Sequence, residues 1–262
     1  MELRVVVVAV VVGCSGGKPK VVEDARSAHH GDATQHPAAR VGYRVDPKIE
    51  KGDVQIRVEW KDVPTVARAS SSFTACGTPR AASVAPTTTW GIPDVLVVIG
   101  VDHGKPFDPP RPRVVLEQCA LAPRVTIAGT TLAIASATEA PAKLALAKTG
   151  QLPLGGDALT TTPRPVYLPI AGHEVEVALE PGVHTLQIEG DSEAAIIVAA
   201  EMPYLAITDA TGQVVLRDVP TGTHAVTAWL PPRAQQPARI AQGKVTVAAG
   251  ALSEVTVDLT KP

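Results

Sequence analysis

Histidine is the residue type in this chain best suited to metal or proton chemistry, and it occurs in two settings. Near the N-terminus three histidines lie within one short segment that also contains Asp32: His29, His30 and His36. Such a group could hold a metal ion weakly, but a flexible segment has no preorganised geometry, so we interpret it as a solvated linker. The other four are isolated in sequence, and we interpret each as a surface or capping residue: His103, His173, His184 and His224.

The sequence contains none of the common catalytic signatures. It has no Gly-x-Ser-x-Gly elbow, no His-Glu-x-x-His zinc motif, no phosphate loop and no Rossmann fingerprint. Glu174 and Glu176 could imitate a catalytic carboxylate pair, but they occupy the polar face of an alternating strand, which is ordinarily the solvated side. The sequence therefore predicts a protein that is not an enzyme and that needs no cofactor.

Residues 1–13 predict an export signal. A short polar start precedes an apolar run at residues 5–12, which is too short to cross a bilayer as a helix of about 20 residues. The sequence Val11-Val12-Gly13-Cys14 resembles the bacterial lipobox, which implies cleavage after Gly13 and a lipid on the Cys14 sulfur. Ser15 after the cysteine favours the outer membrane over retention in the inner membrane. The alternative is an ordinary secretory signal with an incidental cysteine.

Cys76 and Cys119 remain once Cys14 is assigned to the lipid anchor. In an exported protein a remaining pair of cysteines predicts a disulfide. The alternative is that one of the two is a free thiol that serves as a metal ligand.

The composition indicates an all-β fold. Hydrophobic residues make up 45% of the chain and aromatic residues 3%, and 24 Pro and 21 Gly interrupt short Val- and Thr-rich runs. Residues 54–60 alternate apolar and polar side chains as a half-buried strand does, and no long window has the 3.6-residue period of a helix. The net charge of −2 does not suggest a basic, phosphate-seeking surface, so we expect no nucleic-acid partner.

These elements divide the chain into a tether and a folded body. Residues 14–51 are polar and aperiodic, and we expect them to form a lipid-anchored flexible tether. Within the body, we expect a hairpin of residues 174–179 and 183–189 across Glu180-Pro181-Gly182. Residues 70–89 and 106–112 are expected to be loops. Four residues are expected to shape tight turns near the C-terminus: Asp209, Gly212, Pro220 and Gly222.

Two blocks of the sequence carry a family resemblance. The first is PYLAITDATGQVVLRDVPTGTHAVTAW at residues 203–229, and the second is Leu-Glu-Gln-Cys at 116–119 with Pro-Arg-Val at 123–125. They resemble a bacterial exported family, of the methylamine-utilisation type, with a cupredoxin-like domain followed by a carboxypeptidase regulatory-like (transthyretin-like) domain. The resemblance implies a cupredoxin-like β-sandwich at residues 52–201 and a small transthyretin-like β-sandwich at residues 202–262.

The same resemblance implies copper, but the ligand positions hold other residues. A blue-copper site needs two imidazoles and a thiolate, usually with a weak axial thioether. The stretch that leads to a histidine in copper-binding relatives is Ser136-Ala137-Thr138 here, and residues 140–146 contain no histidine. The other compared positions hold no imidazole, thiolate or thioether: Gln187, Gly190, Glu193 and Leu230. We therefore expect a degenerate cupredoxin-like scaffold without its metal.

Together these observations predict a non-catalytic, lipid-anchored protein of the cell envelope that acts as a binding or scaffolding module. Its expected partners are the membrane, through the Cys14 lipid, and an envelope protein or a glycan at the loops that end the sandwiches. Two alternatives remain open. One is a periplasmic copper-binding or electron-transfer cupredoxin, and the other is an accessory glycan-binding module.

Overall fold

A computed structural model describes residues 43–68, 73–74, 76–80, 84, 88–109, 111–152, 161–233 and 236–260 of the chain. The predicted signal at residues 1–13, the lipidation site Cys14, the N-terminal histidines and most of the expected tether lie outside the described residues. So does much of the loop at residues 70–89. Within the described part, no helix is long and apolar enough to cross a membrane.

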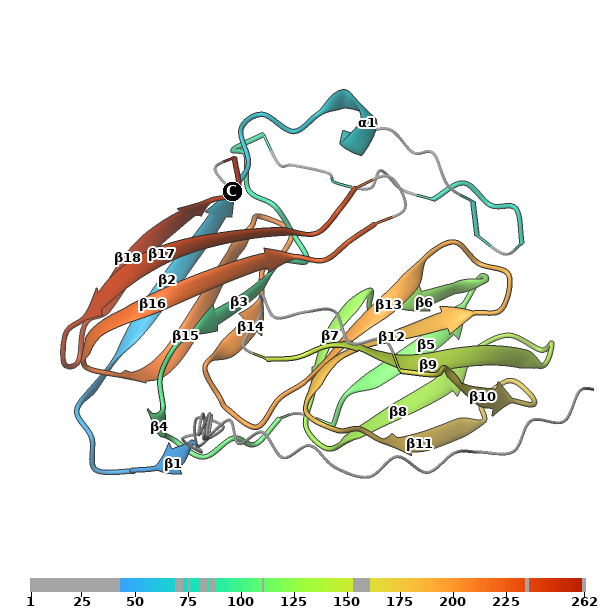
Figure 1. The fold of residues 1–262 in the computed structure, drawn as a ribbon, viewed down its shortest axis with the longest axis horizontal. Helices are drawn as coiled ribbons and strands as arrows, with labels where there is room; N and C mark the ends of the chain where they lie inside the picture. Colours follow the sequence, from blue (N-terminus) through green and yellow to red (C-terminus); the bar gives the residue numbers. More distant parts are fainter. Residues whose placement is uncertain are drawn as a thin grey trace, which may run out of the picture. The chain divides into compact units, whose positions relative to one another are not determined.

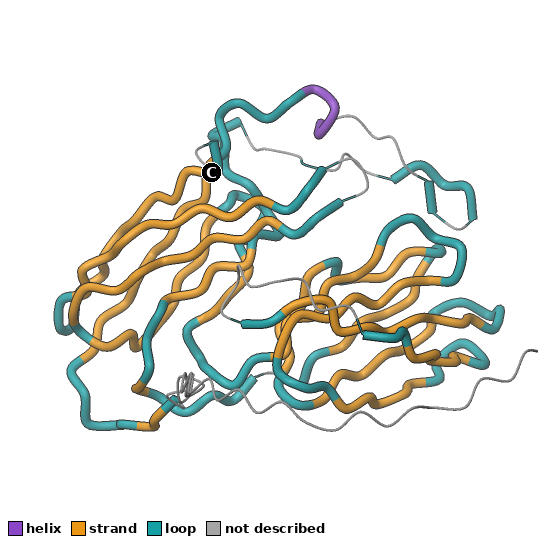
Figure 2. The backbone as a smooth tube through the Cα atoms, viewed as in Figure 1, coloured by secondary structure: helices purple, strands orange, loops and turns teal. Residues whose placement is uncertain are grey.

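The described residues form an all-β structure, which confirms the predicted fold class (Figures 1 and 2). In this part of the chain the α-helix content is the single turn α1, Thr65–Arg68. The strands form four main sheets and one small parallel pair. The four sheets face each other in two pairs, so that the apolar sides of their strands enclose two cores.

The first pair of sheets is called the split sandwich here, because its strands come from two distant parts of the chain. One sheet has the order β14 (Leu205–Ile207), β3 (Leu96–Ile99), β16 (Gly222–Leu230) and β17 (Arg239–Val247). The other has the order β15 (Gln213–Pro220), β2 (Lys51–Glu59) and β18 (Leu252–Asp258). In β2 the alternating residues Val54, Ile56 and Val58 are fully buried in the core between the sheets, as the period of a strand requires.

The second pair, called the middle sandwich, is continuous in sequence. Its larger sheet has the order β10 (Arg164–Leu168), β9 (Ala142–Gly150), β12 (Gly182–Ile188), β13 (Ala194–Ala199) and β7 (Val125–Ala128). Its smaller sheet has the order β11 (Glu174–Ala178), β8 (Thr131–Ser136), β5 (Arg113–Glu117) and β6 (Ala120–Ala122). Leu132, Leu144, Leu168 and Leu186 are among the residues that fill the core between them.

The strand pairing corrects the expected division at residues 52–201 and 202–262. β2 and β3 were assigned to the first domain, but β2 pairs with β15 and β18, and β3 pairs with β14 and β16. The C-terminal sandwich is therefore completed by strands from the start of the body, and the middle sandwich is inserted between its two parts (Figure 1). Alternation along the sequence locates a strand but contains no information about which distant strand completes its sheet.

The expected hairpin of residues 174–179 and 183–189 is wrong. β11 pairs with β8, whereas β12 pairs with β9 and β13, so the two segments lie in opposite sheets. β12 has a strand on each side and offers no free edge to β11. The Pro181-Gly182 turn, with Gly182 at φ 139°, takes the chain from one sheet to the other.

The folded body begins earlier than residue 52, which shortens the expected tether. β1 (Arg44–Val45) pairs in parallel with β4 (His103–Gly104). The Tyr43 hydroxyl donates to the Lys105 carbonyl oxygen at 2.6 Å, and the Tyr43 ring meets the Tyr204 ring edge-on with centroids 6.2 Å apart. Residues 43–51 are therefore part of the fold.

A third apolar cluster joins the sandwiches, and residues 41–262 group as one compact unit. The split sandwich contributes Leu96, Val98 and Trp229, and the middle sandwich contributes Val183 and Ile196, among others. Trp229 is buried in this junction. Trp229 therefore contributes to the contact between the two sandwiches.

The four expected turn residues lie at the two bends of the β14–β15–β16 segment. The Asp209 carboxylate accepts from the backbone N–H groups of Thr211 at 2.8 Å and Gln213 at 3.0 Å. Gly212 has φ 77°, and a Cβ there would lie 2.5 Å from the Cα of Gly91. Pro220 ends β15, and Gly222, with φ 128°, begins β16.

Candidate functional site

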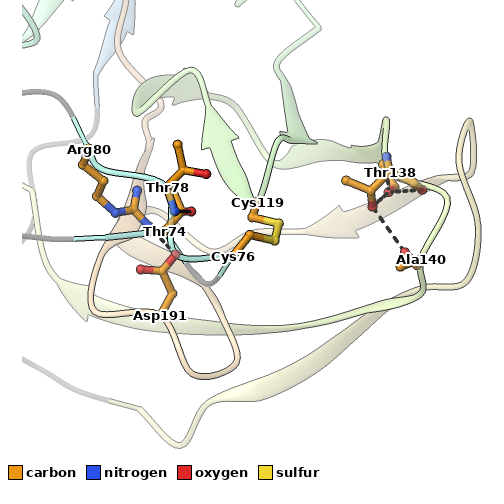
Figure 3. Close-up of a disulfide and its surroundings, with 9 residues drawn as sticks. Thr74, Cys76, Thr78, Arg80, Cys119, Thr138, Ala140 and Asp191 are labelled. Atoms are coloured by element: carbon orange, nitrogen blue, oxygen red, sulfur yellow. Dashed lines mark hydrogen bonds and ion pairs between the residues drawn. A yellow bond between two sulfur atoms is a disulfide. The ribbon is translucent and has the colours of Figure 1, made fainter.

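The disulfide predicted between Cys76 and Cys119 is present, with Cα atoms 5.8 Å apart (Figure 3). Cys119 lies in the two-residue turn that joins β5 to β6, where Glu117 pairs with Ala120. Gln118 and Cys119 have φ values of 48° and 61°, and two successive positive values are typical of the tight turn that matches the twist of a hairpin. A cysteine in this conformation directs the bond toward the loop that precedes β3.

Cys76 lies in a small closed loop at residues 73–80. The Thr74 N–H donates to the Thr78 carbonyl oxygen at 2.9 Å, and the Thr78 N–H donates to the Thr74 hydroxyl oxygen at 3.2 Å. Phe73 and Pro79 form an isolated β-bridge at the base of the loop. Because the disulfide fixes this loop to the β5–β6 turn, Arg80, which follows the loop directly, is held beside the middle sandwich.

Arg80 binds two acidic side chains of the turn between β12 and β13 (Figure 3 shows it pointing at Asp191). Its guanidinium contacts the Asp191 carboxylate and lies 3.8 Å from the Glu193 carboxylate. The Asp191 side chain is 1% exposed and the Glu193 side chain is 8% exposed. The second Asp191 oxygen accepts from the Glu193 N–H at 3.0 Å, so this buried acid is satisfied on both sides.

Two more arginines extend these contacts into a network. Arg124 lies 3.4 Å from Glu193, and Arg233 of the split sandwich donates to Asp94 at 2.9 Å. Burial lowers the pKa of Arg124, an effect that Glu193 opposes. Burial, reinforced by the positive charge of Arg124, lowers the pKa of Arg233 to about 10. The Arg233 guanidinium therefore stays protonated at neutral pH.

A pocket of about 500 Å³ lies against this network. Its polar lining comes from the closed loop, the β5–β6 hairpin, the β6–β7 connection and the β12–β13 turn: Thr74, Thr78, Arg80, Glu117, Gln118, Arg124, Asp191 and Glu193. One wall is β6, the edge strand of its sheet, through Ala120, Leu121 and Ala122. The pocket therefore combines charged groups that hold each other in place with a strand edge at which backbone groups face outward.

The arrangement is suited to recognition. Four of the charged side chains that line the pocket are fixed by ion pairs, so their directions are set before any ligand arrives: Arg80, Arg124, Asp191 and Glu193. The residues that line the pocket include no histidine and no free thiol, and the described residues contain no group of three His, Cys, Asp or Glu side chains placed to hold a metal ion.

The positions compared with copper ligands form local contacts instead. The Ser136 hydroxyl bonds with the Thr138 hydroxyl at 2.9 Å, which closes the turn that Figure 3 shows beside Ala140. Glu193 belongs to the arginine network. Gln187 donates to the Asp191 carbonyl oxygen at 2.6 Å, and Leu230 is fully buried in the core of the split sandwich.

One of the four body histidines differs from expectation. His103 bonds with the neighbouring Asp102 at 2.6 Å, His173 is exposed, and His224 is half-buried with its Nε2 bonded to the Pro220 carbonyl oxygen at 2.8 Å. His184, expected to be a surface or capping residue, bonds through Nε2 with the Glu180 carbonyl oxygen at 2.8 Å but is only 6% exposed. It lies on β12, between β9 and β13, and lines a hollow together with Lys148 and Arg164.

The arginine network was missed by the reasoning from sequence. Arg80, Arg124 and Arg233 are far apart along the chain, and each resembles an ordinary surface arginine when viewed locally. The available signal was the spacing of Asp191 and Glu193 just before the apolar strand at residues 194–200, where two acids are followed by a doubly buried strand.

No family model matches the chain, and no curated protein matches it. Among solved structures, one described as "Novel Purple Cupredoxin from Nitrosopumilus maritimus" is similar with 13% identity, over 34% of this chain and 99% of its own, at a TM-score of 0.23. A likeness at this level carries no conclusion about fold or copper. The all-β class is established by the strands and sheets themselves.

Proposed function

We propose that this protein is a non-catalytic binding or scaffolding module of the cell envelope and that the pocket beside Arg80 and Arg124 is where it receives a partner. The observation that carries the proposal is the disulfide-fixed loop, which places Arg80 on Asp191 and Glu193 at the mouth of a polar pocket. A protein that only needs a stable core has no need for a charged network at a pocket, because apolar residues of similar volume stabilise at least as well.

The chemistry of the pocket favours an extended polypeptide segment as the partner group. β6 pairs with β5 on one side, and its own sheet ends there. An added strand could use the backbone groups of this edge, while the Thr74, Thr78 and Gln118 side chains select polar side chains of the incoming segment. Such a mode requires no metal and no nucleophile.

The location in the envelope rests on the N-terminal sequence. The lipobox-like Val11-Val12-Gly13-Cys14 supports a lipid on Cys14, and Ser15 supports the outer membrane as the destination. A disulfide in the folded body agrees with an oxidising compartment outside the cytoplasm.

The proposal is tested by site-specific photocrosslinking in the native envelope. A photoreactive amino acid at Ala122, exposed on β6, should yield one discrete protein adduct, and the same residue at Leu252 on β18 should yield none. Replacing Arg124 with Gln in the Ala122 background should weaken the adduct.

Identical labelling from the two positions, or no adduct from Ala122, would overturn the proposal. Metal analysis of protein purified without a histidine tag provides an independent criterion. One tightly held equivalent of copper would favour the electron-transfer alternative over a binding module.

A further inference from the structure

We infer that the middle sandwich carries a second site, which binds a tetrahedral oxyanion such as a phosphate or sulfate group between Lys148, Arg164 and His184. These residues come from β9, β10 and β12 and converge on a hollow of about 270 Å³. Its remaining polar lining consists of Thr161, Thr162 and Glu180. This site is separate from the pocket beside Arg80, because the two share no lining residue.

The strand register places the cationic groups together. Lys148 and His184 are directly paired on β9 and β12, and Arg164 begins β10, which pairs with β9. The Lys148 side chain is 21% exposed and lies over Gly182, where a Cβ would meet its Cε at 2.8 Å. The absence of a side chain at residue 182 therefore lets the ammonium group reach the hollow.

His184 is held in an orientation that suits an anion. Its buried ring donates from Nε2 to the Glu180 carbonyl oxygen at 2.8 Å, which leaves Nδ1 as the second polar atom of the ring. Burial, with the nearby charges of Lys148 and Arg164, lowers the pKa of His184, while the Glu180 carbonyl and carboxylate oppose the shift. An anion between these groups would favour the protonated ring, in which Nδ1 also donates.

The Glu180 carboxylate already occupies one position that an oxyanion would take. It lies 3.1 Å from the Lys148 Nζ, yet its side chain is 81% exposed. An ion pair this exposed is weak and exchangeable. With two permanent cations against this one carboxylate, the hollow has a net positive charge even when His184 is neutral.

The size and lining of the hollow indicate the class of ligand. A tetrahedral oxyanion accepts several hydrogen bonds in different directions, and the hollow offers an ammonium, a guanidinium, an imidazole and the Thr162 hydroxyl group. The Thr161 hydroxyl already bonds with the Lys148 backbone N–H and carbonyl oxygen. Arg164 donates one N–H to the Ala178 carbonyl oxygen at 2.5 Å, and within the described part of the chain no other hydrogen bond of its guanidinium is seen. The oxyanion could be a free ion or a lipid headgroup, since both present the same chemistry.

Inorganic sulfate is the probe for the first experiment, because its charge does not change with pH over the range used. It is titrated calorimetrically into the folded full chain at about pH 5.5 and about pH 8, on either side of the ordinary histidine pKa of about 6.5. We expect saturable binding that is about fivefold tighter at the lower pH, as one added charge at contact distance predicts. Replacing the exposed Arg164 with Gln should abolish sulfate binding.

Glu180→Gln separates this proposal from a purely structural salt bridge. Removing the competing carboxylate should tighten sulfate binding about fivefold, whereas a structural pair predicts no binding in either protein. The matched control is Glu189→Gln, because Glu189, which directly follows β12, forms a similar ion pair at 3.2 Å with Lys143 of β9. Equal sulfate affinity in the two glutamine variants, or an unaltered affinity in Arg164→Gln, would overturn the proposal.

A second experiment identifies the source of the oxyanion. Protein with Cys14 replaced by Ser is mixed with vesicles of phosphatidylcholine, with or without phosphatidic acid, and with free glycerol phosphate. If the protein sediments with phosphatidic acid vesicles and Arg164→Gln abolishes this sedimentation, the oxyanion is a lipid headgroup. If the protein binds only glycerol phosphate, the oxyanion is a soluble ester. Binding to neither would contradict the site.

Discussion

Removing the disulfide should destabilise the protein by an amount that follows from its position in the chain. Cys76 and Cys119 are 43 positions apart. In the chain-entropy model, a cross-link that closes a loop of this length stabilises the folded state by about 4 kcal/mol, because it restricts the unfolded chain. The variant is Cys76→Ala with Cys119→Ala, made in a Cys14→Ser background so that no free thiol remains.

The measurement is guanidinium-induced unfolding followed by far-ultraviolet circular dichroism. We expect the midpoint to fall by the equivalent of about 4 kcal/mol while the native β spectrum is retained, because the bond links a loop to a turn and contributes to neither core. The oxidised parent, unfolded in the presence of a reductant, serves as the control and should show the same loss.

A thiol count checks the starting state. The unfolded, unreduced Cys14→Ser protein should contain no reactive thiol. A stability loss below about 1 kcal/mol would refute the entropic reasoning, because it would mean that the segment between the cysteines stays ordered in the unfolded chain. Two titratable thiols would refute the bond itself.

Three further outcomes are expected. Gly212→Ala should lower the free energy of unfolding, measured by chemical denaturation, more than Gly250→Ala does. Both glycines have positive φ, but only a Cβ at residue 212 would clash with backbone, 2.5 Å from the Cα of Gly91. Equal losses in the two variants would contradict this reasoning. Without a bound anion, the free energy of unfolding should decline as pH falls below about 6.5. The reason is that burial lowers the pKa of His184 in the folded protein, so the unfolded chain binds the proton more readily. A His184→Gln variant with the same pH profile would contradict this explanation. Cys14→Ser should move the protein from the membrane fraction to the soluble envelope fraction, and retention in the membrane would exclude the lipid anchor.

The positions of β2, β11 and β12 were predictable, because the relevant signal is local. In β2 the alternation of Val54, Ile56 and Val58 with polar residues corresponds to alternating burial along the strand. The disulfide was likewise predictable from export and cysteine count. These inferences need only near neighbours in sequence or a simple tally of residue types.

The partners of the strands were not predictable from the same signal. The Pro-Gly turn between residues 174–179 and 183–189 is equally compatible with a hairpin and with a connection between two sheets. The second arrangement occurs because β9 and β13 pair with both edges of β12. The arginine network was hidden for a related reason. Arg80 and Asp191 are 111 positions apart, so only the folded chain reveals that they meet.

The split sandwich has a consequence for the order of folding. Gln55 on β2 and Gln213 on β15 are hydrogen-bonded at 2.8 Å although 158 positions separate them. A chain that emerges N-terminus first therefore presents β2 with two unpaired edges until its last strands arrive, while the contiguous middle sandwich has all its partners earlier. Such long-range pairing slows folding and leaves a strand open to pairing with other chains. The end of the chain thus controls when the first long strand is protected.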